Sequence, residues 1–255
     1  MKKYSLLFAL AILFSGILHA QEFKLAKSTG KLIIKDLNHV SLEGSAGNEI
    51  IFTSLDGPDE KDKRAEGLRA VSSMGLEDNT GIGLAVIDKG TTYEVYQLKK
   101  MDGPRVKILV PKGVSVYLSH SSPYGEDVKL KNMENEIETS TVHNGIHLEN
   151  VTGPIIIKTV HGEIEADFSA GIKSPIVISS QHGLVDVTIL ASAKVTMSMK
   201  TSFGEIFVDP AFKMQVETSG DLVKYSSNKV NGKINGGGIE ISLTSTHDNI
   251  YLRKK

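Results

Sequence analysis

His161–Phe168 (HGEIEADF), His182–Ile189 (HGLVDVTI) and Phe203–Val208 (FGEIFV) are three copies of one pattern. Each copy begins with a ring-bearing residue and a glycine, and the ring residues follow one another at intervals of 21 residues. Apolar and polar residues alternate on both sides of each ring residue. A fixed period near twenty, built from two short alternating runs, is typical of a β-solenoid, in which each turn contributes the same small set of strands.

In a β-solenoid, equivalent residues of successive turns lie above one another, because neighbouring parallel strands are about 4.8 Å apart. Alternation sends every second side chain inward, and the inward positions are mostly apolar residues that favour strands. Two inward columns are expected: Ile155, Ile176 and Met197 in one, and Ile164, Val185 and Ile206 in the other. The glycine after each ring residue marks a tight corner where a side chain would clash.

The same register extends in both directions with small shifts. Upstream it includes His143 and Tyr124, and downstream Ser219-Gly220 takes the place of the ring residue and the glycine. A last turn runs through Gly238–Leu243. We therefore expect an all-β chain with a parallel β-helix of about six or seven turns over residues 111–255.

Residues 21–110 are also rich in strand candidates, but in a less regular register. These strands are expected to begin the solenoid or to cover its first turn, because an open strand edge invites pairing with another chain. Two alternatives stay open for residues 59–73, a short surface helix or an insertion. Residues 21–255 are expected to form a single domain. The strand candidates are Lys31–Ile34, Val40–Leu42, Glu49–Phe52, Gly83–Ile87, Tyr93–Val95 and Val106–Val110.

Residues 1–20 have the features of a secretory signal peptide. Two lysines precede the apolar run Leu6–Leu18, and the small residue Ala20 precedes the expected cleavage before Gln21. The run is shorter than the roughly 20 residues that span a bilayer, so a membrane anchor is the less favoured alternative. We expect an exported protein, in the periplasm, on the cell surface or secreted, without a transmembrane segment after cleavage.

Composition narrows the classes of partner and of site. Removal of residues 1–20 takes away two of the 29 lysines and arginines and none of the 30 acids, so the formal net charge changes from −1 to −3. This balance argues against nucleic acid as a partner. The chain has no cysteine, which excludes disulfides, thiolate metal sites, cysteine nucleophiles and a lipid-modified cysteine.

Three further segments carry a resemblance to a known family. Ala65–Leu68 (AEGL), Asp78–Leu84 (DNTGIGL) and Val110–Val114 (VPKGV), together with the turns that follow them, resemble the bacterial putative-adhesin family of exported β-solenoid proteins. The resemblance covers most of residues 21–255. It implies a single right-handed parallel β-helix at the cell envelope, and it supplies no catalytic or binding residue that could be transferred to this chain.

The ring residues form a column for which two interpretations stay open. His143, His161 and His182 lie on consecutive turns and could bind a metal ion through neutral imidazoles. The alternative is a stack of flat side chains at the corner. Tyr124 and Phe203 occupy the ends of the column, and phenylalanine cannot bind a metal, so stacking is favoured.

A second column lies four residues after the ring position and should face outward. It contains His147, Glu165, Asp186 and Phe207. Like charges on neighbouring strands repel, so Glu165 beside Asp186 requires a cation nearby. A divalent cation held by these carboxylates with His147 is one interpretation, and solvated surface charge is the favoured one.

The pair Glu165 and Asp186 also suggests an alternative function, that of a polysaccharide-active β-helix enzyme. Glycosidases place two acids roughly 5 to 10 Å apart around a sugar bond. A flat outer sheet, however, lacks the burial that raises the pKa of a general acid. A protein without catalytic residues or a cofactor is therefore favoured over an enzyme.

These observations favour an exported cell-envelope protein of adhesin-like type, with a binding or structural role. Its expected partners are envelope polymers, carbohydrate or surface proteins. A structural scaffold that associates end to end with other copies is a further alternative. The terminal residues Arg253–Lys255 are expected to form a solvated tail rather than an anion site.

Overall fold

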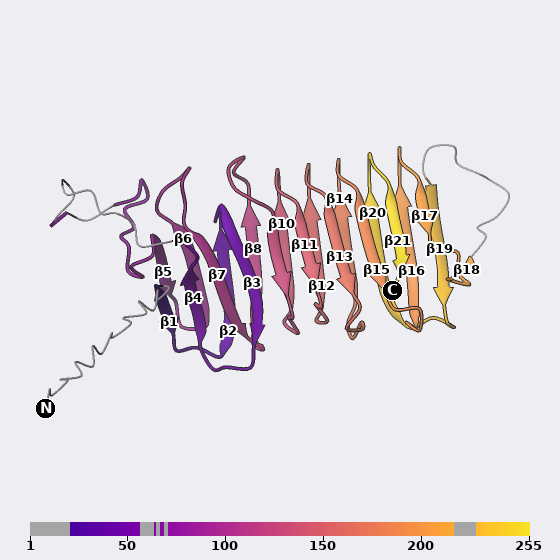
Figure 1. Ribbon diagram of the computed structural model, residues 1–255, viewed down its shortest axis with the longest axis horizontal. Coiled ribbons are helices and arrows are strands. Elements are labelled where there is room, and N and C mark those ends of the chain that lie inside the picture. Colours follow the sequence, from indigo (N-terminus) through magenta and orange to yellow (C-terminus); the bar gives the residue numbers. More distant parts are fainter. Residues whose placement is uncertain (1–20, 57–63, 65–66, 69–70, 217–227) are drawn as a thin grey trace, which may run out of the picture.

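The computed structural model describes residues 21–56, 64, 67–68, 71–216 and 228–255, and the regular structure in these ranges is all β-strand (Figure 1). The expected signal peptide, most of segment 59–73 and the expected turn at Ser219-Gly220 lie outside the described residues. No helix within the described ranges is long and apolar enough to cross a membrane. The strands are β1 (Glu22–Leu25), β2 (Thr29–Lys35), β3 (His39–Ser45), β4 (Ile50–Ser54), β5 (Leu84–Asp88), β6 (Thr92–Gln97), β7 (Arg105–Pro111), β8 (Gly113–His120), β9 (Val128–Lys131), β10 (Ile137–Thr141), β11 (Ile146–Glu149), β12 (Ile155–Thr159), β13 (Ile164–Phe168), β14 (Ile176–Ser180), β15 (Val185–Ile189), β16 (Val195–Thr201), β17 (Ile206–Val208), β18 (Gln215–Val216), β19 (Asn228–Ile234), β20 (Ile239–Ser245) and β21 (Ile250–Lys254).

The strands form two long mixed sheets that extend along the molecule in Figure 1. Sheet A has 10 strands in the order β1-β4-β7-β3-β9-β11-β13-β15-β21-β17. Sheet B has 11 strands in the order β18-β19-β16-β20-β14-β12-β10-β8-β2-β6-β5. The inward side chains of both sheets belong to one apolar core, and burial alternates along the strands, as the period of two predicted.

Consecutive strands alternate between the sheets. Strand β10 lies in sheet B, β11 in sheet A, β12 in sheet B again and β13 in sheet A. We call such a consecutive pair a rung, and each rung pairs in parallel with the next one in space. Antiparallel strands flank the parallel rungs, β1, β4 and β5 at one end and β18 and β19 at the other. In spatial order the parallel rungs are β6–β7, β2–β3, β8–β9, β10–β11, β12–β13, β14–β15, β20–β21 and β16–β17.

The spatial order of the rungs differs from the chain order near the C-terminal end. Ile155 lies beside Ile176, as predicted. Met197 was expected directly beside Ile176, but Ile241 lies between the two, because β20 pairs with both β14 and β16. The expected last turn through Gly238–Leu243 is therefore an interior rung. Between Val208 and this rung, the described strands β18 and β19 pair antiparallel and do not continue the parallel register.

The N-terminal region shows the same arrangement. All six strand candidates between residues 31 and 110 are strands, and they belong to the same two sheets as the later strands. Rung β2–β3 lies between rung β6–β7 and rung β8–β9. At both ends, therefore, a rung that is distant in the sequence lies between two rungs that follow one another in the chain.

A ladder of buried hydroxyl groups holds the corner between the sheet B strand and the next sheet A strand in five neighbouring rungs. In rung β14–β15 the Ser180 hydroxyl accepts a hydrogen bond from the backbone N–H of Gly183 at 2.8 Å and donates one to the carbonyl of Gly162 in the preceding rung at 3.1 Å. Such a hydroxyl satisfies two backbone groups that the core would otherwise leave without a partner. The ladder consists of Thr141, Thr159, Ser180, Ser245 and Thr201 on adjacent strands, and all five are buried.

The corner glycines allow the rungs to approach closely. A Cβ atom on Gly162, Gly183 or Gly204 would lie 2.0 to 2.1 Å from a carbonyl oxygen of the neighbouring rung. These glycines are therefore required for the approach of one backbone to the next, which confirms the sequence interpretation of the corner.

Removal of one hydroxyl from the ladder should destabilise the fold. We expect Ser180→Ala to lower the free energy of unfolding by about 1 to 3 kcal/mol, because it leaves a buried N–H and a buried carbonyl without partners. Ser180→Thr is the matched control, because threonine occupies the same ladder position in three other rungs. Urea unfolding followed by circular dichroism measures both variants, and equal stability of the two would contradict the role of the ladder.

The rung order can be tested with engineered cysteines, since the chain contains none. Val177 and Ser242 are direct neighbours on β14 and β20, so Val177→Cys with Ser242→Cys should form a disulfide under mild oxidation. Val177→Cys with Ser198→Cys should not, because β20 separates these strands by two spacings, about 9.6 Å, which exceeds disulfide reach. Ile156→Cys with Val177→Cys is the positive control. A disulfide in the second pair rather than the first would overturn this rung order.

Candidate binding groove on the outer face of sheet A

The second sequence column is present on the outer face of sheet A. His147, Glu165 and Asp186 are direct neighbours on β11, β13 and β15, as predicted. They face outward because the residues on either side of them in each strand are buried. Phe207 does not follow Asp186 directly, because Tyr251 of the inserted strand β21 lies between them.

His147 lies between two carboxylates. Its Nδ1 is 3.1 Å from Oε2 of Glu165, and its Nε2 is 3.1 Å from Oδ2 of Asp127. The other oxygen of Asp127 accepts a hydrogen bond from the backbone N–H of Gly145 at 2.6 Å. The imidazole is therefore held in one orientation across the strands.

Asp186 pairs with Arg253. The Nε of Arg253 lies 2.8 Å from each carboxylate oxygen of Asp186. Arg253 places a positive group beside Asp186, and His147 bonds Glu165, so each of the two neighbouring acids has a partner. The expectation that Arg253–Lys255 form a solvated tail is wrong, because Arg253 and Lys254 belong to β21 and Lys255 binds a carboxylate.

Lys255 binds Asp167, the third acid of this face. Its Nζ is 2.9 Å from Oδ2 of Asp167, and the backbone N–H of Ser169 donates to Oδ1 at 2.8 Å. Burial by itself would raise the pKa of Asp167, but the hydrogen bonds from Lys255 and Ser169 outweigh burial and hold this pKa below its ordinary value.

These side chains surround a shallow groove of about 630 Å³ that extends across strands β9, β11, β13, β15 and β21. Its lining contains both acids and bases, with Lys131 paired to Glu149 beside the pairs already described. We call this hollow the groove. Its lining residues are Lys129, Lys131, His147, Leu148, Glu149, Glu165, Ala166, Asp167, Asp186, Thr188 and Arg253.

Two aromatic rings adjoin the groove at its C-terminal end. The rings of Phe207 and Tyr251, which we call the aromatic pair, are stacked with centroids 5.2 Å apart and planes 10° apart. A smaller hollow of about 220 Å³ lies against both rings and shares Arg253 with the groove. The two hollows therefore form one continuous surface.

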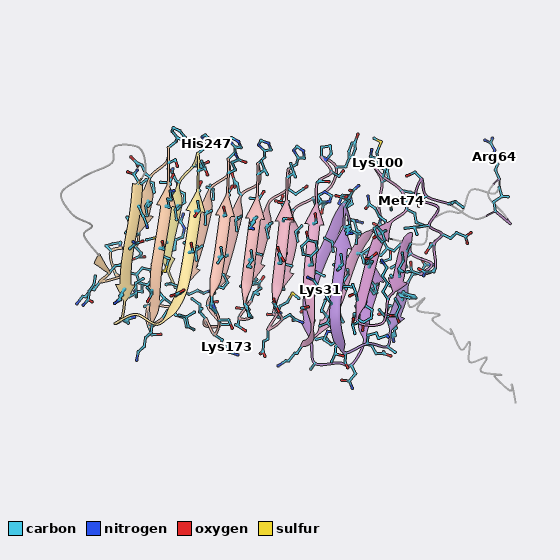
Figure 2. The ribbon with its side chains drawn as sticks, turned by 180° about the vertical axis from the view of Figure 1, so that it is seen from behind. Lys31, Arg64, Met74, Lys100, Lys173 and His247 are labelled. Carbon is cyan, nitrogen blue, oxygen red and sulfur yellow. The ribbon has the colours of Figure 1, made fainter. Side chains whose placement is uncertain are left out.

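The ring column forms a stack along one edge of the molecule, where Figure 2 labels His247, with Lys173 labelled on the opposite edge. Successive centroids from His143 through His161, His182 and His247 to Phe203 are 5.7, 4.9, 4.6 and 4.8 Å apart. Sequence reasoning missed His247, because rung β20–β21 is out of chain order. Tyr124 lies in the corner between β8 and β9, residues 121–127, which is longer than the four-residue corners of the histidines.

The stacked geometry does not suit a shared metal ion. Two nitrogen ligands of one zinc ion lie at most about 4.2 Å apart and aim their lone pairs at a common point. Parallel imidazoles with centroids 4.6 to 5.7 Å apart aim their in-plane lone pairs side by side instead. Within the described ranges, no group of three or more histidines and acids is arranged to hold a metal ion, whether around His143, His161 and His182 or around His147, Glu165 and Asp186.

Comparison with known proteins gave matches among solved structures. One is a putative cell adhesion protein from Clostridium sporogenes, with 12% identity, a TM-score of 0.43 and coverage of 92% of this chain and 100% of that chain. Another is a putative adhesin from Bacteroides fragilis, with 11% identity, a TM-score of 0.37 and coverage of 92% and 96%. A third is a putative adhesin from Parabacteroides merdae, with 9% identity, a TM-score of 0.23 and coverage of 92% and 93%.

All three carry the adhesin description that the sequence resemblance indicated. No family model matches the chain, and no curated protein matches it.

The pairing of Asp167 with Lys255 predicts a pH dependence of stability. In the folded protein the pKa of Asp167 lies below the ordinary aspartate value of about 3.9, so the ionised carboxylate stabilises the fold above that pH. This contribution to stability is lost as the pH falls through the lowered pKa of Asp167. We expect the urea midpoint of Asp167→Asn to decrease less than that of the wild type between about pH 5 and pH 3. Asp102→Asn, at an exposed turn position, is the matched control. Parallel decreases in the wild type and Asp167→Asn would contradict the prediction.

Proposed function

We propose that this chain is an exported, adhesin-like protein of the cell envelope that binds its partner through the groove on sheet A and performs no catalysis. The observation that carries the proposal is the groove itself, a broad, shallow hollow lined by exposed polar side chains of five neighbouring strands. A surface of this kind binds through area and through repeated polar columns rather than through a deep pocket.

The arrangement of the two acids supports binding over hydrolysis. Both oxygens of Asp186 already accept hydrogen bonds from Arg253, so neither is placed to donate a proton to a glycosidic oxygen. Glu165 is engaged by His147 on an open face. These contacts favour a binding protein over the alternative of a polysaccharide-active enzyme.

The proposal includes the architecture and the route to the envelope. The parallel rungs would form a single right-handed β-solenoid, as the family resemblance implies, and the N-terminal segment would direct export. N-terminal sequencing of the protein recovered from the periplasm, the cell surface or the medium should show Gln21 as the first residue. Recovery of the unprocessed chain from the cytoplasm alone would contradict export.

The groove is tested by binding to immobilised partners, namely envelope polysaccharides, peptidoglycan, mucin and extracellular surface proteins. We expect measurable binding to at least one of them and at least about a tenfold loss, or 1.4 kcal/mol, in the double variant Glu165→Gln with Arg253→Gln. The matched control is Lys158→Ala with Lys200→Ala, two exposed changes on the outer face of sheet B.

Three results would overturn the proposal. Equal losses in the groove variant and the sheet B control, or no binding to any partner, would remove the groove as the binding surface. Release of sugar products by the wild type, abolished by Asp186→Asn, would show an enzyme.

A further inference from the structure

The aromatic pair and the groove together specify a class of ligand. Phe207 is 44% exposed, although one face of its ring lies against Tyr251. Strand β17, which carries Phe207, is the last strand of sheet A in the described part of the chain. The aromatic pair therefore offers an apolar surface at the end of an otherwise polar groove.

Tyr251 is fixed in its orientation by three neighbours. The side-chain amide of Asn249 donates to its hydroxyl at 3.1 Å, the Phe207 ring covers one side, and the Arg253 guanidinium carbon lies 5.2 Å from the ring centre. A ring held in this way loses little freedom when a ligand packs against it. The aromatic pair is thus organised before binding.

The charge of the groove excludes strongly charged ligands. Four acids and three bases line it, and Lys255, which pairs with Asp167 at the rim, makes the numbers equal. A polyanion or a polycation would meet as many repelling as attracting groups. A hydroxyl group both donates and accepts hydrogen bonds, so a ligand rich in hydroxyls can use the acids and the bases alike.

The shape of the groove favours an extended chain. The groove and the aromatic pair extend over six neighbouring strands of sheet A, β9 to β17 in spatial order, and five spacings of about 4.8 Å give a length of roughly 24 Å. The ligand would lie across a sheet face, where the backbone groups are already paired, so the groove does not suit an added β-strand. Sugar rings combine apolar C–H faces, which pack on aromatic rings, with hydroxyl groups around their edges.

We infer that the groove binds a neutral linear polysaccharide, with one sugar ring packed against the aromatic pair and the adjoining sugars hydrogen-bonded to Asp186, Arg253 and Glu165. This inference rests on the proposed function, because it names the partner class of the same surface. It assigns Phe207 and Tyr251 to binding, which sequence reasoning did not do.

The test uses affinity electrophoresis of the full processed chain in gels that contain neutral polysaccharides (hydroxyethylcellulose, glucomannan, arabinoxylan or dextran) or anionic ones (alginate or polygalacturonate). We expect retardation by at least one neutral polysaccharide. Phe207→Ala should weaken this binding at least about tenfold. Because the ligand is uncharged, the affinity should change less than about threefold when the salt concentration is raised from about 0.05 to 0.5 M.

Phe203→Ala is the matched control. Phe203 belongs to the same rung as Phe207 and is 75% exposed, but it ends the ring stack and does not line either hollow. We expect Phe203→Ala to bind like the wild type, with circular dichroism confirming that both variants fold.

A second variant keeps the inference testable if Phe207→Ala does not fold. The chain contains no tryptophan, so Phe207→Trp introduces a single tryptophan at the aromatic pair, and its emission can be excited apart from that of the tyrosines. Its emission should shift when the retarding polysaccharide is added and should not shift with alginate.

The outcomes separate the inference from the proposed function. Binding only to anionic polysaccharides or to proteins would overturn the inference and leave the proposed function intact. Neutral binding that Phe207→Ala leaves unchanged, or that occurs without a shift in Trp emission, would also overturn the inference. The absence of binding to every carbohydrate and protein probe would overturn both.

Discussion

The constraint on which the structure depends is the close contact of successive backbones at one corner of four adjacent rungs, from β12–β13 to β16–β17 in spatial order. There, a buried serine or threonine hydroxyl joins the N–H of its own corner to a carbonyl of the spatially preceding rung. Glycine at Gly162, Gly183 and Gly204 leaves room for that approach. Because the hydroxyl can bond only when the rungs are in register, the corner fixes which residues of neighbouring strands lie side by side.

Fixed register determines the chemistry of the outer faces. Each outward residue meets the equivalent residues of the two adjacent rungs, so charges and rings form columns rather than scattered groups. On sheet A the charge of Asp186 is offset by Arg253, the neighbouring acid Glu165 is bonded by His147, and two aromatic rings continue the same column. The histidine stack follows from the same geometry at the corner, which explains its nearly parallel rings without a metal ion.

The period of two in the sequence correctly predicted the strands and which of their residues face inward or outward, because alternation is a local property. The order of the rungs is not local. Strands β14, β16 and β20 share the same succession of inward apolar residue, hydroxyl and ring, so each fits beside either of the others. Tyr251 and Arg253 could not be assigned to the groove from the sequence, because they reach it only through the insertion of β21 between β15 and β17. The hydroxyl ladder could have been predicted from the sequence, because a serine or threonine stands two residues before each stacked ring residue.

The interior position of rung β20–β21 has a consequence for how the protein matures. This rung follows β14 and β16 in the chain, yet both strands obtain their final partner only from it, across a separation of 65 residues between Ile176 and Ile241. Until β20 is synthesised, β14 and β16 have matching edges that can pair with each other in a non-native arrangement. The native order of the rungs therefore forms only after β20 has become available.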